Sequence, residues 1–378
     1  MKTVLRTSLA VVLGVLATAQ AGPYYTCVDL GPAGFDCSVA GGASGGQQVG
    51  YGWGAATGGI MHAVRWTGTA GSFLDLNPSG FFWSQAWGVS GGYQVGWGKS
   101  YDYANEHALL WTGTAESVVD LHPPGFDASW ATGASGGQQA GYGWSYATGG
   151  YPHALLWTGT PGSAVDLNPA GFTFSWATGT SGTQQVGYGQ GEATGDRPHA
   201  LLWAGTAEGV VDLNPAGLDF STAQGISGGR QVGEGTGEAT SYARHALLWG
   251  GTAESMVDLH PAGFEMSWAY AVFGDQQVGG GAFTDSGYLV EHALVWDGTA
   301  GGCVDLQAFV PWPSFPYSGA YGVDEAGNIT GVIYDTNWDH PHAVMWIPQI
   351  SGEVPEPGAL VAIGLGLIAL RRRRMNRT

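Results

Sequence analysis

Short apolar segments separated by glycine-rich turns run along most of the chain. Within a segment, successive residues alternate between two faces, with the period of two that is typical of β-strands. In the segment from His153 to Trp157, this alternation places His153, Leu155 and Trp157 on one face and Ala154 and Leu156 on the other. Both faces are mostly apolar. We therefore expect this strand to be covered on both sides.

The same segment recurs seven times as His-Ala-x-x-Trp, at successive spacings of 45, 46, 46, 46, 47 and 50 residues. A Val-Asp-Leu-like segment and a Gln-x-Val-Gly-like segment keep step with it. So constant a period indicates a repeat protein with one structural unit per block. The seven marker histidines are His62, His107, His153, His199, His245, His292 and His342.

Each unit reads as a β-meander of four short strands, because turn residues interrupt it at regular points. In the third unit we expect strands at Ser117–Leu121, Trp130–Ser135, Gln138–Gly143 and His153–Trp157. Four-stranded sheets with a period of 40 to 50 residues are typical of propeller blades. The sequence thus predicts an all-β, seven-bladed β-propeller. An open β-solenoid is the main alternative, but solenoids usually need distinct polar caps, and both end units here keep the markers.

The first residues follow the order of a secretory signal peptide: Lys2 and Arg6, the apolar run Leu9–Leu16, and small residues ending at Ala21. We expect cleavage after Ala21 and three regions: a signal peptide at 1–21, the propeller at 22–348 and a C-terminal tail at 349–378.

The tail contains Pro355, Glu356 and Pro357, then the uncharged run Gly358–Leu370, then four arginines. That run would span only about 20 Å as a helix, which is short for a permanent membrane anchor. It fits a transient anchor that holds its arginines on the cytoplasmic side.

This tail closely resembles the PEP-CTERM sorting signal of Gram-negative bacteria. The resemblance implies recognition by exosortase, removal of the tail and release or attachment at the cell surface, often in species that make exopolysaccharide. The membrane would then be a partner only through the tail, before processing, and the inner membrane would hold the protein only transiently.

The repeat also resembles the HAF family of extracellular repeats, through His-Ala-Leu-Leu-Trp, Asp-Leu-Asn-Pro, Ser-x-Ala-x-Gly-x-Ser and Gln-x-Val-Gly. Leu or Val replaces the Phe of the family's His-Ala-Phe triplet, as at Leu155. The match covers about residues 26 to 348. The resemblance implies an extracellular location and carries no established catalytic activity.

Charge narrows the range of partners. Between the two expected cleavage regions, residues 22–354 hold five basic and 29 acidic residues, a formal net charge near −24. Nucleic acid is a poor partner for such a surface, because phosphate binding needs basic residues. Divalent cations and neutral or cationic polymers fit it better.

Three cysteines are present, and export permits a disulfide. Cys27 and Cys37 flank a Gly-Pro-Ala-Gly turn and could lie diagonally on one face of a hairpin, so we favour this pair. Buried free thiols are the alternative for Cys27, Cys37 and Cys303.

Seven histidines and seven aspartates at constant positions suggest metal sites or acid–base catalysis at first sight. A residue that every blade carries is more economically explained as part of the frame, since an active site would occur once. We expect each His to hold a turn or an Asp through a ring nitrogen, and each repeated Trp to pack between blades. We accordingly expect no catalytic site and no cofactor.

Function should lie where the units differ. Successive turns of a meander alternate between two rims, and nearly all variation falls on the rim of the loops that precede each His, joined by the insertion of unit seven within 307–318. The candidate ligand-contacting residues are Trp53, Tyr101, Tyr103, Trp144, Tyr146, Tyr151, Trp312, Tyr317, Trp338 and Asp339.

Exposed Trp and Tyr beside Asp, Asn and Gln suit carbohydrate, because apolar sugar faces stack on rings while hydroxyls bond to polar groups. Acidic loops could instead collect Ca²⁺, which takes six to eight oxygen ligands. Three functions stay open: a surface or matrix module that binds exopolysaccharide, a purely structural or adhesive surface protein, and a glycan-degrading enzyme with paired carboxylates near the axis.

Overall fold

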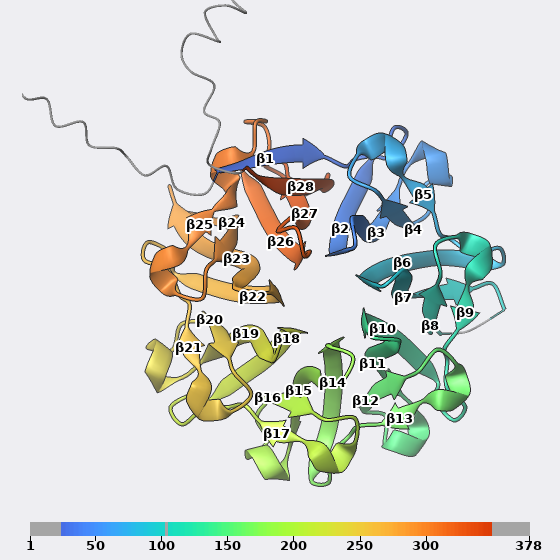
Figure 1. Ribbon diagram of the computed structural model, residues 1–378, viewed down its shortest axis with the longest axis vertical. Helices are drawn as coiled ribbons and strands as arrows, with labels where there is room; N and C mark the ends of the chain where they lie inside the picture. Colours follow the sequence, from blue (N-terminus) through green and yellow to red (C-terminus); the bar gives the residue numbers. More distant parts are fainter. Residues whose placement is uncertain (1–23, 103–104, 350–378) are drawn as a thin grey trace, which may run out of the picture. The chain divides into compact units, whose positions relative to one another are not determined.

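The computed structural model describes residues 24–102 and 105–349, and Tyr25–Pro348 form one compact unit. Seven four-stranded antiparallel sheets surround a common axis in this unit (Figure 1). The prediction of an all-β, seven-bladed propeller is confirmed.

Each of the first four blades contains four consecutive strands. Blade 1 holds β2 (Cys37–Ser44), β3 (Gln47–Trp53), β4 (His62–Trp66) and β5 (Leu74–Asp75). Blade 2 holds β6 (Phe81–Ser90), β7 (Tyr93–Ser100), β8 (His107–Trp111) and β9 (Val119–Asp120). Blade 3 holds β10 (Ala128–Ser135), β11 (Gln138–Trp144), β12 (Pro152–Trp157) and β13 (Val165–Asp166). Blade 4 holds β14 (Phe172–Thr180), β15 (Gln185–Gly191), β16 (His199–Trp203) and β17 (Val211–Asp212).

Blades 5 and 6 follow the same plan, and blade 7 departs from it. Blade 5 holds β18 (Phe220–Ser227), β19 (Arg230–Thr236), β20 (His245–Trp249) and β21 (Val257–Asp258). Blade 6 holds β22 (Met266–Phe273), β23 (Gln276–Asp285), β24 (Tyr288–Trp296) and β25 (Val304–Asp305). Blade 7 combines β26 (Tyr317–Val323), β27 (Ile329–Tyr334) and β28 (His342–Gln349) with β1 (Tyr24–Asp29) from the start of the chain.

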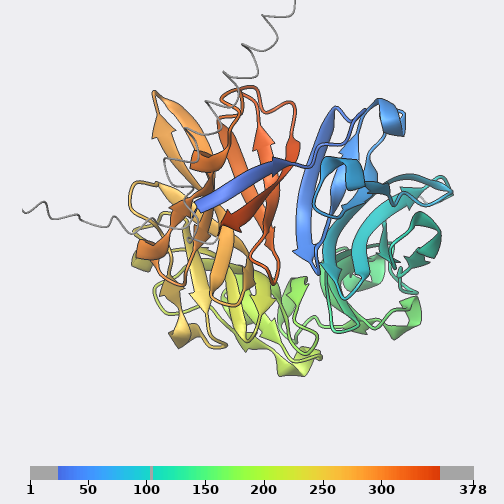
Figure 2. The same cartoon turned by 45° about the horizontal axis from the view of Figure 1, so that its top comes forward.

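The ring is closed because β1, from the start of the chain, joins the sheet of the last blade. β1 is the outermost strand of blade 7, beside β28, and Leu30 N–H donates to Ala343 O at 2.8 Å just beyond it. Figure 2 shows the blue β1 lying across the orange and red strands of the last blade. The first and last parts of the propeller are therefore held in one sheet.

Blade boundaries fall one strand later than the sequence unit predicted. Val119 and Asp120 pair with Leu110 and Leu109 of β8, so they complete blade 2 instead of opening blade 3. The strand that begins near His153 is consequently the third of its blade, not the fourth. The reason is the short 3₁₀ turn after the repeated Trp of blades 1 to 6, which returns the chain to the same sheet as a brief outer strand.

Single 3₁₀ turns occur in two kinds of connection: the loop before the His strand and the turn after the repeated Trp. In four blades one precedes the His strand. Glycine at positive φ commonly ends this turn, as at Gly149 with φ 70° after η4. The turns are η1 (Ala55–Thr57), η2 (Ala70–Ser72), η3 (Ala115–Ser117), η4 (Tyr146–Thr148), η5 (Pro161–Ser163), η6 (Glu192–Thr194), η7 (Ala207–Gly209), η8 (Glu238–Thr240), η9 (Ala253–Ser255), η10 (Ala300–Gly302) and η11 (Leu306–Phe309).

The meander defines two faces of the ring. The hairpin face carries the tight turns between the first and second strands of each blade and the turns after each repeated Trp. The loop face carries the loops that precede each His and the connectors from one blade to the next. The strands nearest the axis are β2, β6, β10, β14, β18, β22 and β26 (Figure 1).

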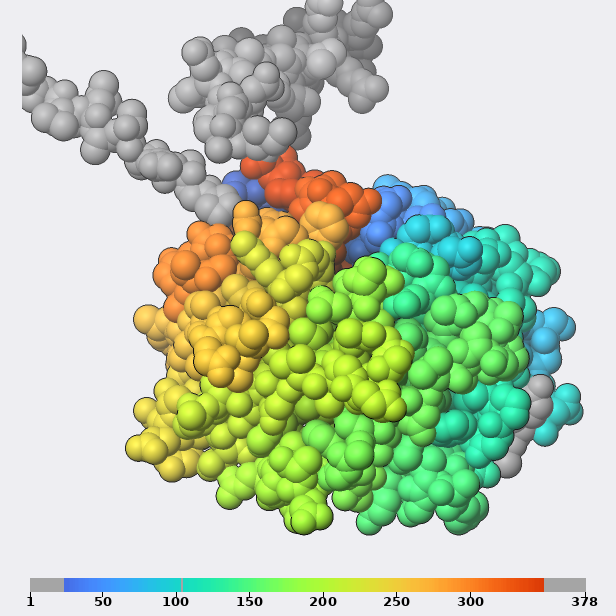
Figure 3. All heavy atoms as spheres, turned by 60° about the horizontal axis from the view of Figure 1, so that its bottom comes forward, coloured from blue at the N-terminus to red at the C-terminus, as the bar shows by residue number. Residues whose placement is uncertain are grey.

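The core is divided among the interfaces between neighbouring blades. Between blades 1 and 2, Trp111 and Leu109 of β8 pack with Val49 of β3, Ala86 of β6 and Leu76 of the connector, all fully buried. The seven repeated tryptophans are all buried in this way, as expected. Figure 3 shows neighbouring blades in close contact along one side of the ring. Each blade thus needs both neighbours to bury its two apolar faces.

The expected Cys27–Cys37 disulfide is not formed. All three cysteines are free thiols, and Cys27 and Cys37 are buried. Cys27 lies in β1, the outer strand of blade 7, whereas Cys37 begins β2, the inner strand of blade 1. The hairpin on which the prediction rested does not exist, because the ring closure sends the two strands to different sheets.

Candidate functional site

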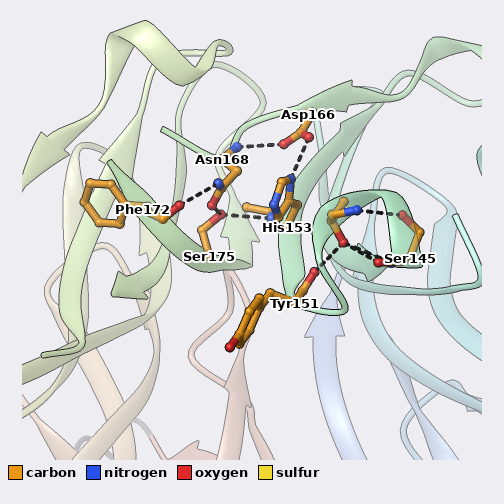
Figure 4. Close-up of polar contacts among 9 residues, drawn as sticks. Ser145, Tyr151, His153, Asp166, Asn168, Phe172 and Ser175 are labelled. Atoms are coloured by element: carbon orange, nitrogen blue, oxygen red, sulfur yellow. Dashed lines mark hydrogen bonds and ion pairs between the residues drawn. The ribbon is translucent and has the colours of Figure 1, made fainter. Parts of the chain in front are cut away.

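The repeated His and Asp belong to a hydrogen-bond chain that crosses from one blade to the next (Figure 4). Asp166 accepts from His153 Nδ1 at 2.7 Å and from the Asn168 backbone N–H at 2.8 Å. Asn168 Oδ1 accepts from Ser175 Oγ at 2.7 Å, and Ser175 Oγ accepts from Ala154 N–H at 3.1 Å. His153 and Asp166 belong to blade 3 and Ser175 to blade 4, so this chain ties two blades together.

The same His–Asp contact recurs in six blades, with His Nδ1 to Asp Oδ2 distances of 2.7 or 2.8 Å. The expectation that each His holds an Asp is confirmed for these six pairs. Their polar atoms are occupied by the frame. The pairs are His62–Asp75, His107–Asp120, His153–Asp166, His199–Asp212, His245–Asp258 and His292–Asp305.

Two blades replace the connector Asn with a histidine. His122 Nε2 lies 3.0 Å from Phe126 O and its Nδ1 lies 2.9 Å from Ser129 Oγ, while its ring stacks on His107 at 3.8 Å. Because a carbonyl can only accept, Nε2 carries the proton and Nδ1 accepts from the hydroxyl. Burial, and then the neighbouring His107, lowers the pKa of His122. His260 repeats this arrangement on His245 at 3.9 Å.

Symmetry breaks near the axis. Each inner strand bulges after its alanine, and the bulged residue of blade 2 is Trp87. A Cβ on Gly41 of the neighbouring β2 would lie 2.9 Å from the Trp87 ring, so that ring passes directly over the glycine. It reaches Tyr321 of blade 7 at 6.3 Å and lies 5.6 Å from Tyr51 and 6.0 Å from Trp97. Trp87 therefore connects two blades that are not neighbours.

A second aromatic series lines the opposite part of the inner wall. Trp130 stacks on Tyr142 at 4.9 Å, Tyr142 on Trp176 at 5.0 Å, and Trp176 contacts Tyr188 at 5.1 Å. Burial raises the pKa of Tyr142 to about 12, so this phenol stays neutral and can donate a hydrogen bond at physiological pH.

Blades 5 and 6 carry a cluster of charged side chains in the part of each blade where blades 3 and 4 carry the aromatic series. Arg244 Nε and Nη2 each donate to the buried Glu234 at 2.6 Å, and the guanidinium lies 5.0 Å from the Trp268 ring. Burial raises the pKa of Glu291, and Arg244 partly counteracts it. Both oxygens of Glu234 are engaged by Arg244, so this arrangement is a bidentate ion pair rather than an open acid–base pair.

The predicted site did not include these inner residues, although the sequence contains a signal for them. Within the repeated Ser-x-Ala-x-Gly strand, the two x positions vary between units and include Trp87, Trp130, Trp176 and Tyr321. Their importance depends on which strand is innermost, and the repeat alone does not show that.

The predicted loop residues lie on the loop face, mostly well exposed. Tyr101 is 70% exposed, Tyr146 84% and Tyr151 49%. Tyr101 contacts Phe82 at 5.7 Å and Tyr146 contacts Trp144 at 6.0 Å. Trp53 ends β3 and is half-buried.

The predicted residues of unit seven fall into two groups. Tyr317 and Trp338 stack at 4.4 Å, and Asp339 N–H donates to Asp335 nearby. Trp312 instead packs against the core cluster of blades 6 and 7 and is half-buried. The insertion thus uses Trp312 mainly as a structural anchor. Tyr103 and the processing residues Ala21, Pro355, Glu356 and Pro357 lie outside the described residues, as does the expected hydrophobic segment of the tail.

A cleft of about 300 Å³ opens on the loop face where blade 1 meets blade 2. Its lining is largely apolar, and the polar side chain at its base is Gln85, whose Oε1 accepts from Trp87 Nε1 at 3.0 Å. The cleft therefore adjoins the axial aromatic residues. It is lined by Gly59, Ile60, Met61, Phe82, Trp83 and Gln85.

Exposed aromatic side chains are concentrated on the loop face. In the described part of the chain, seven of them lie there, two on the hairpin face and one in β1. The loop-face residues are Phe82, Tyr101, Tyr146, Tyr151, Tyr242, Tyr288 and Trp338; the hairpin-face residues are Tyr93 and Phe273.

No group of three or more His, Cys, Asp or Glu among the described residues is placed to hold a metal ion. Within those same residues, no helix has the length and apolar character needed to span a membrane.

Residues 353–374 match the PEP-CTERM protein-sorting motif. The chain therefore ends in a signal that exosortase recognises, and it is an exported protein sorted to the cell surface. No curated protein sequence matches the chain.

Several solved structures share the fold. The β-propeller domain of the trilobed protease from Pyrococcus furiosus aligns with a TM-score of 0.56 at 10% identity, over 84% of this chain and 96% of that one. Puromycin hydrolase aligns with a TM-score of 0.54 at 11% identity, over 83% of this chain and 53% of that one. The chain therefore spans about half of that protein. An oligogalacturonate lyase from Vibrio parahaemolyticus aligns with a TM-score of 0.50 at 8% identity, over 88% of this chain and 99% of that one. At these identities the likeness concerns the fold alone. The Pyrococcus domain has an open velcro topology, whereas β1 completes the last blade here.

Proposed function

We propose that this exported propeller is a non-catalytic binding module for extracellular polysaccharide at the surface of a Gram-negative bacterium. The observation that carries the proposal is the gathering of exposed aromatic residues on the loop face, against two on the hairpin face. Rings of this kind bind sugars through their apolar faces. A protein sorted to the cell surface meets polysaccharide there.

The constant residues support a scaffold role for the rest of the molecule. The repeated His and Asp side chains bond to each other in six blades, and the repeated Trp side chains are buried. The resemblance of the repeat to HAF extracellular repeats agrees with this division. We propose that the tail serves as a transient inner-membrane anchor until exosortase removes it.

Binding of the purified full chain to the producer's own extracellular polysaccharide tests this proposal. The chain should co-sediment with the polymer, and the triple variant Tyr101→Ala, Tyr146→Ala, Trp338→Ala should bind at least about tenfold more weakly, a loss of about 1.4 kcal/mol. The matched control replaces the exposed hairpin-face residues Tyr93 and Phe273 by Ala and should bind normally. Absence of binding by the unaltered chain would favour the purely structural or adhesive role. Release of shortened glycans would favour an enzyme.

A further inference from the structure

The Trp338 ring packs against two tyrosines at the loop face of blade 7. Its ring stacks on Tyr317 at 4.4 Å with 14° between the planes, and lies 5.0 Å from Tyr334. Tyr317 and Tyr334 are cross-strand partners in β26 and β27, so both project to the same side of the sheet. They support one side of the indole, and Trp338 is nonetheless 40% exposed. The exposed area therefore lies on the parts of the ring that the two tyrosines leave uncovered.

The backbone holds Trp338 in a conformation that a bulky residue rarely adopts. Its φ is 62°, in the left-handed region that favours glycine. Asp335 fixes the surrounding loop, because its carboxylate accepts from the N–H groups of Asn337 and Asp339 and from His340 Nδ1. Desolvation acts to raise the pKa of Asp335, but these hydrogen bonds together lower it. Such strain persists where the surroundings over-determine a conformation, and it is commonest at functional positions.

The carboxylates near Trp338 favour a neutral sugar over an anionic one. Asp335 and Asp339 belong to the loop of Trp338, and the Cys37 thiol donates to Asp339 O at 3.7 Å, which brings the neighbouring Asp36 to the same loop. The whole chain carries a formal net charge of −18. A polyuronate would be repelled from such a surface, whereas a neutral sugar would not.

The geometry points to Trp338 as a stacking platform for a neutral hexopyranose unit of a polysaccharide, with Tyr317 and Tyr334 as its support and Asp335 as the residue that positions its loop. The flat C–H face of a pyranose ring with equatorial hydroxyls matches an open indole face, and its hydroxyls would reach the carboxylates at the rim. This inference rests on the proposed binding function and adds the site and the sugar class.

The sharpest variant is Trp338→Gly, because glycine accepts the positive φ without strain. The relief of strain offsets part of the lost stacking, so the thermal midpoint should change little. Ser241→Gly is the matched control: Ser241 has a φ of 52°, is exposed, carries no ring and lies in the corresponding loop of blade 5. Trp338→Tyr, which keeps a ring, should retain part of the binding.

Calorimetric titration of the full chain with β-1,4-glucan and galactomannan oligosaccharides, and with polygalacturonate, provides the test. We expect binding to at least one neutral glycan, loss of about tenfold or more in affinity for Trp338→Gly, and no loss for Ser241→Gly. Polygalacturonate should not bind. Equal affinity of Trp338→Gly and the unaltered chain would overturn the platform, as would equally tight binding of polygalacturonate or failure of every neutral glycan to bind. If Trp338→Gly still binds the producer's polysaccharide normally, the platform is refuted while the proposed function stands.

Discussion

At the residue scale, one buried hydroxyl joins two blades. Ser175 is fully buried, accepts from the backbone of Ala154 and donates to Asn168. Ser175→Ala removes that acceptor and leaves the Ala154 N–H unpaired, so it should lower the free energy of unfolding by about 1–3 kcal/mol. Thr173→Ala, an exposed position on the same strand, should change it by less than about 0.5 kcal/mol. Denaturant unfolding of the two variants measures the difference, and equal stability would show that the hydrogen-bond chain contributes little.

Individual residues were predictable where the repeat constrains them. The pairing of each His with an Asp follows from their constant spacing and from the need of half-buried polar groups for partners. The participation of Ser175 could not be predicted, because it belongs to the next blade and the arrangement of the strands was needed to bring it close. Trp87 was missed for a similar reason: its contacts with Gly41 and Tyr321 depend on the inner strand and its bulge.

At the scale of one element, the connector after the outer strand has two chemical forms in blades 1 to 5, with either asparagine or histidine at the same position. Asn168 occupies it in blade 3, and its Nδ2 donates to Phe172 O while Oδ1 accepts from Ser175. His122 and His260 make the equivalent contacts with a neutral ring in blades 2 and 5. The two forms are interchangeable in their hydrogen bonds but not in their response to acid.

This difference predicts an acid-sensitive stability. The pKa values of His122 and His260 are lowered in the folded protein from an ordinary value of 6.5, chiefly by burial. Below about pH 6.5 the unfolded chain binds protons more readily than the folded one, so stability is lost as the pH falls through that value. The variant with His122→Asn and His260→Asn should lose less thermal stability between about pH 7.5 and about pH 5. An unchanged pH profile in this variant would mean that other groups control acid unfolding.

At the scale of the whole molecule, β1 determines whether the ring is closed. Tyr25 of β1 is 3% exposed, and its ring lies 5.7 Å from Phe309 of η11, in the connector that leads to blade 7. Tyr25→Ala should therefore lower the free energy of unfolding by about 3–4 kcal/mol and increase amide exchange in β28. Tyr24→Ala, at a neighbouring position that is 60% exposed, should cost less than about 1 kcal/mol. Similar costs for the two variants would contradict a closing role for β1.

The number of blades and their strand content were predictable from the period and the turn residues. The position of the blade boundary was not, because a two-residue outer strand such as Val119–Asp120 can pair with either neighbouring sheet. The disulfide prediction failed for the same reason, since Cys27 and Cys37 were assigned to one hairpin. A hint of the true arrangement was available: a Val-Asp-Leu-like segment precedes the first His-Ala-x-x-Trp, and none follows the last one.

The central claim is that the repeated residues build the frame and the loop face binds the ligand. A crystal of the protein soaked in oligosaccharide fragments of the producer's own polysaccharide tests it most directly. The account predicts sugar density over the loop face, with a ring on the outward side of Trp338. Density confined to the hairpin face, around Tyr93 and Phe273, would contradict it.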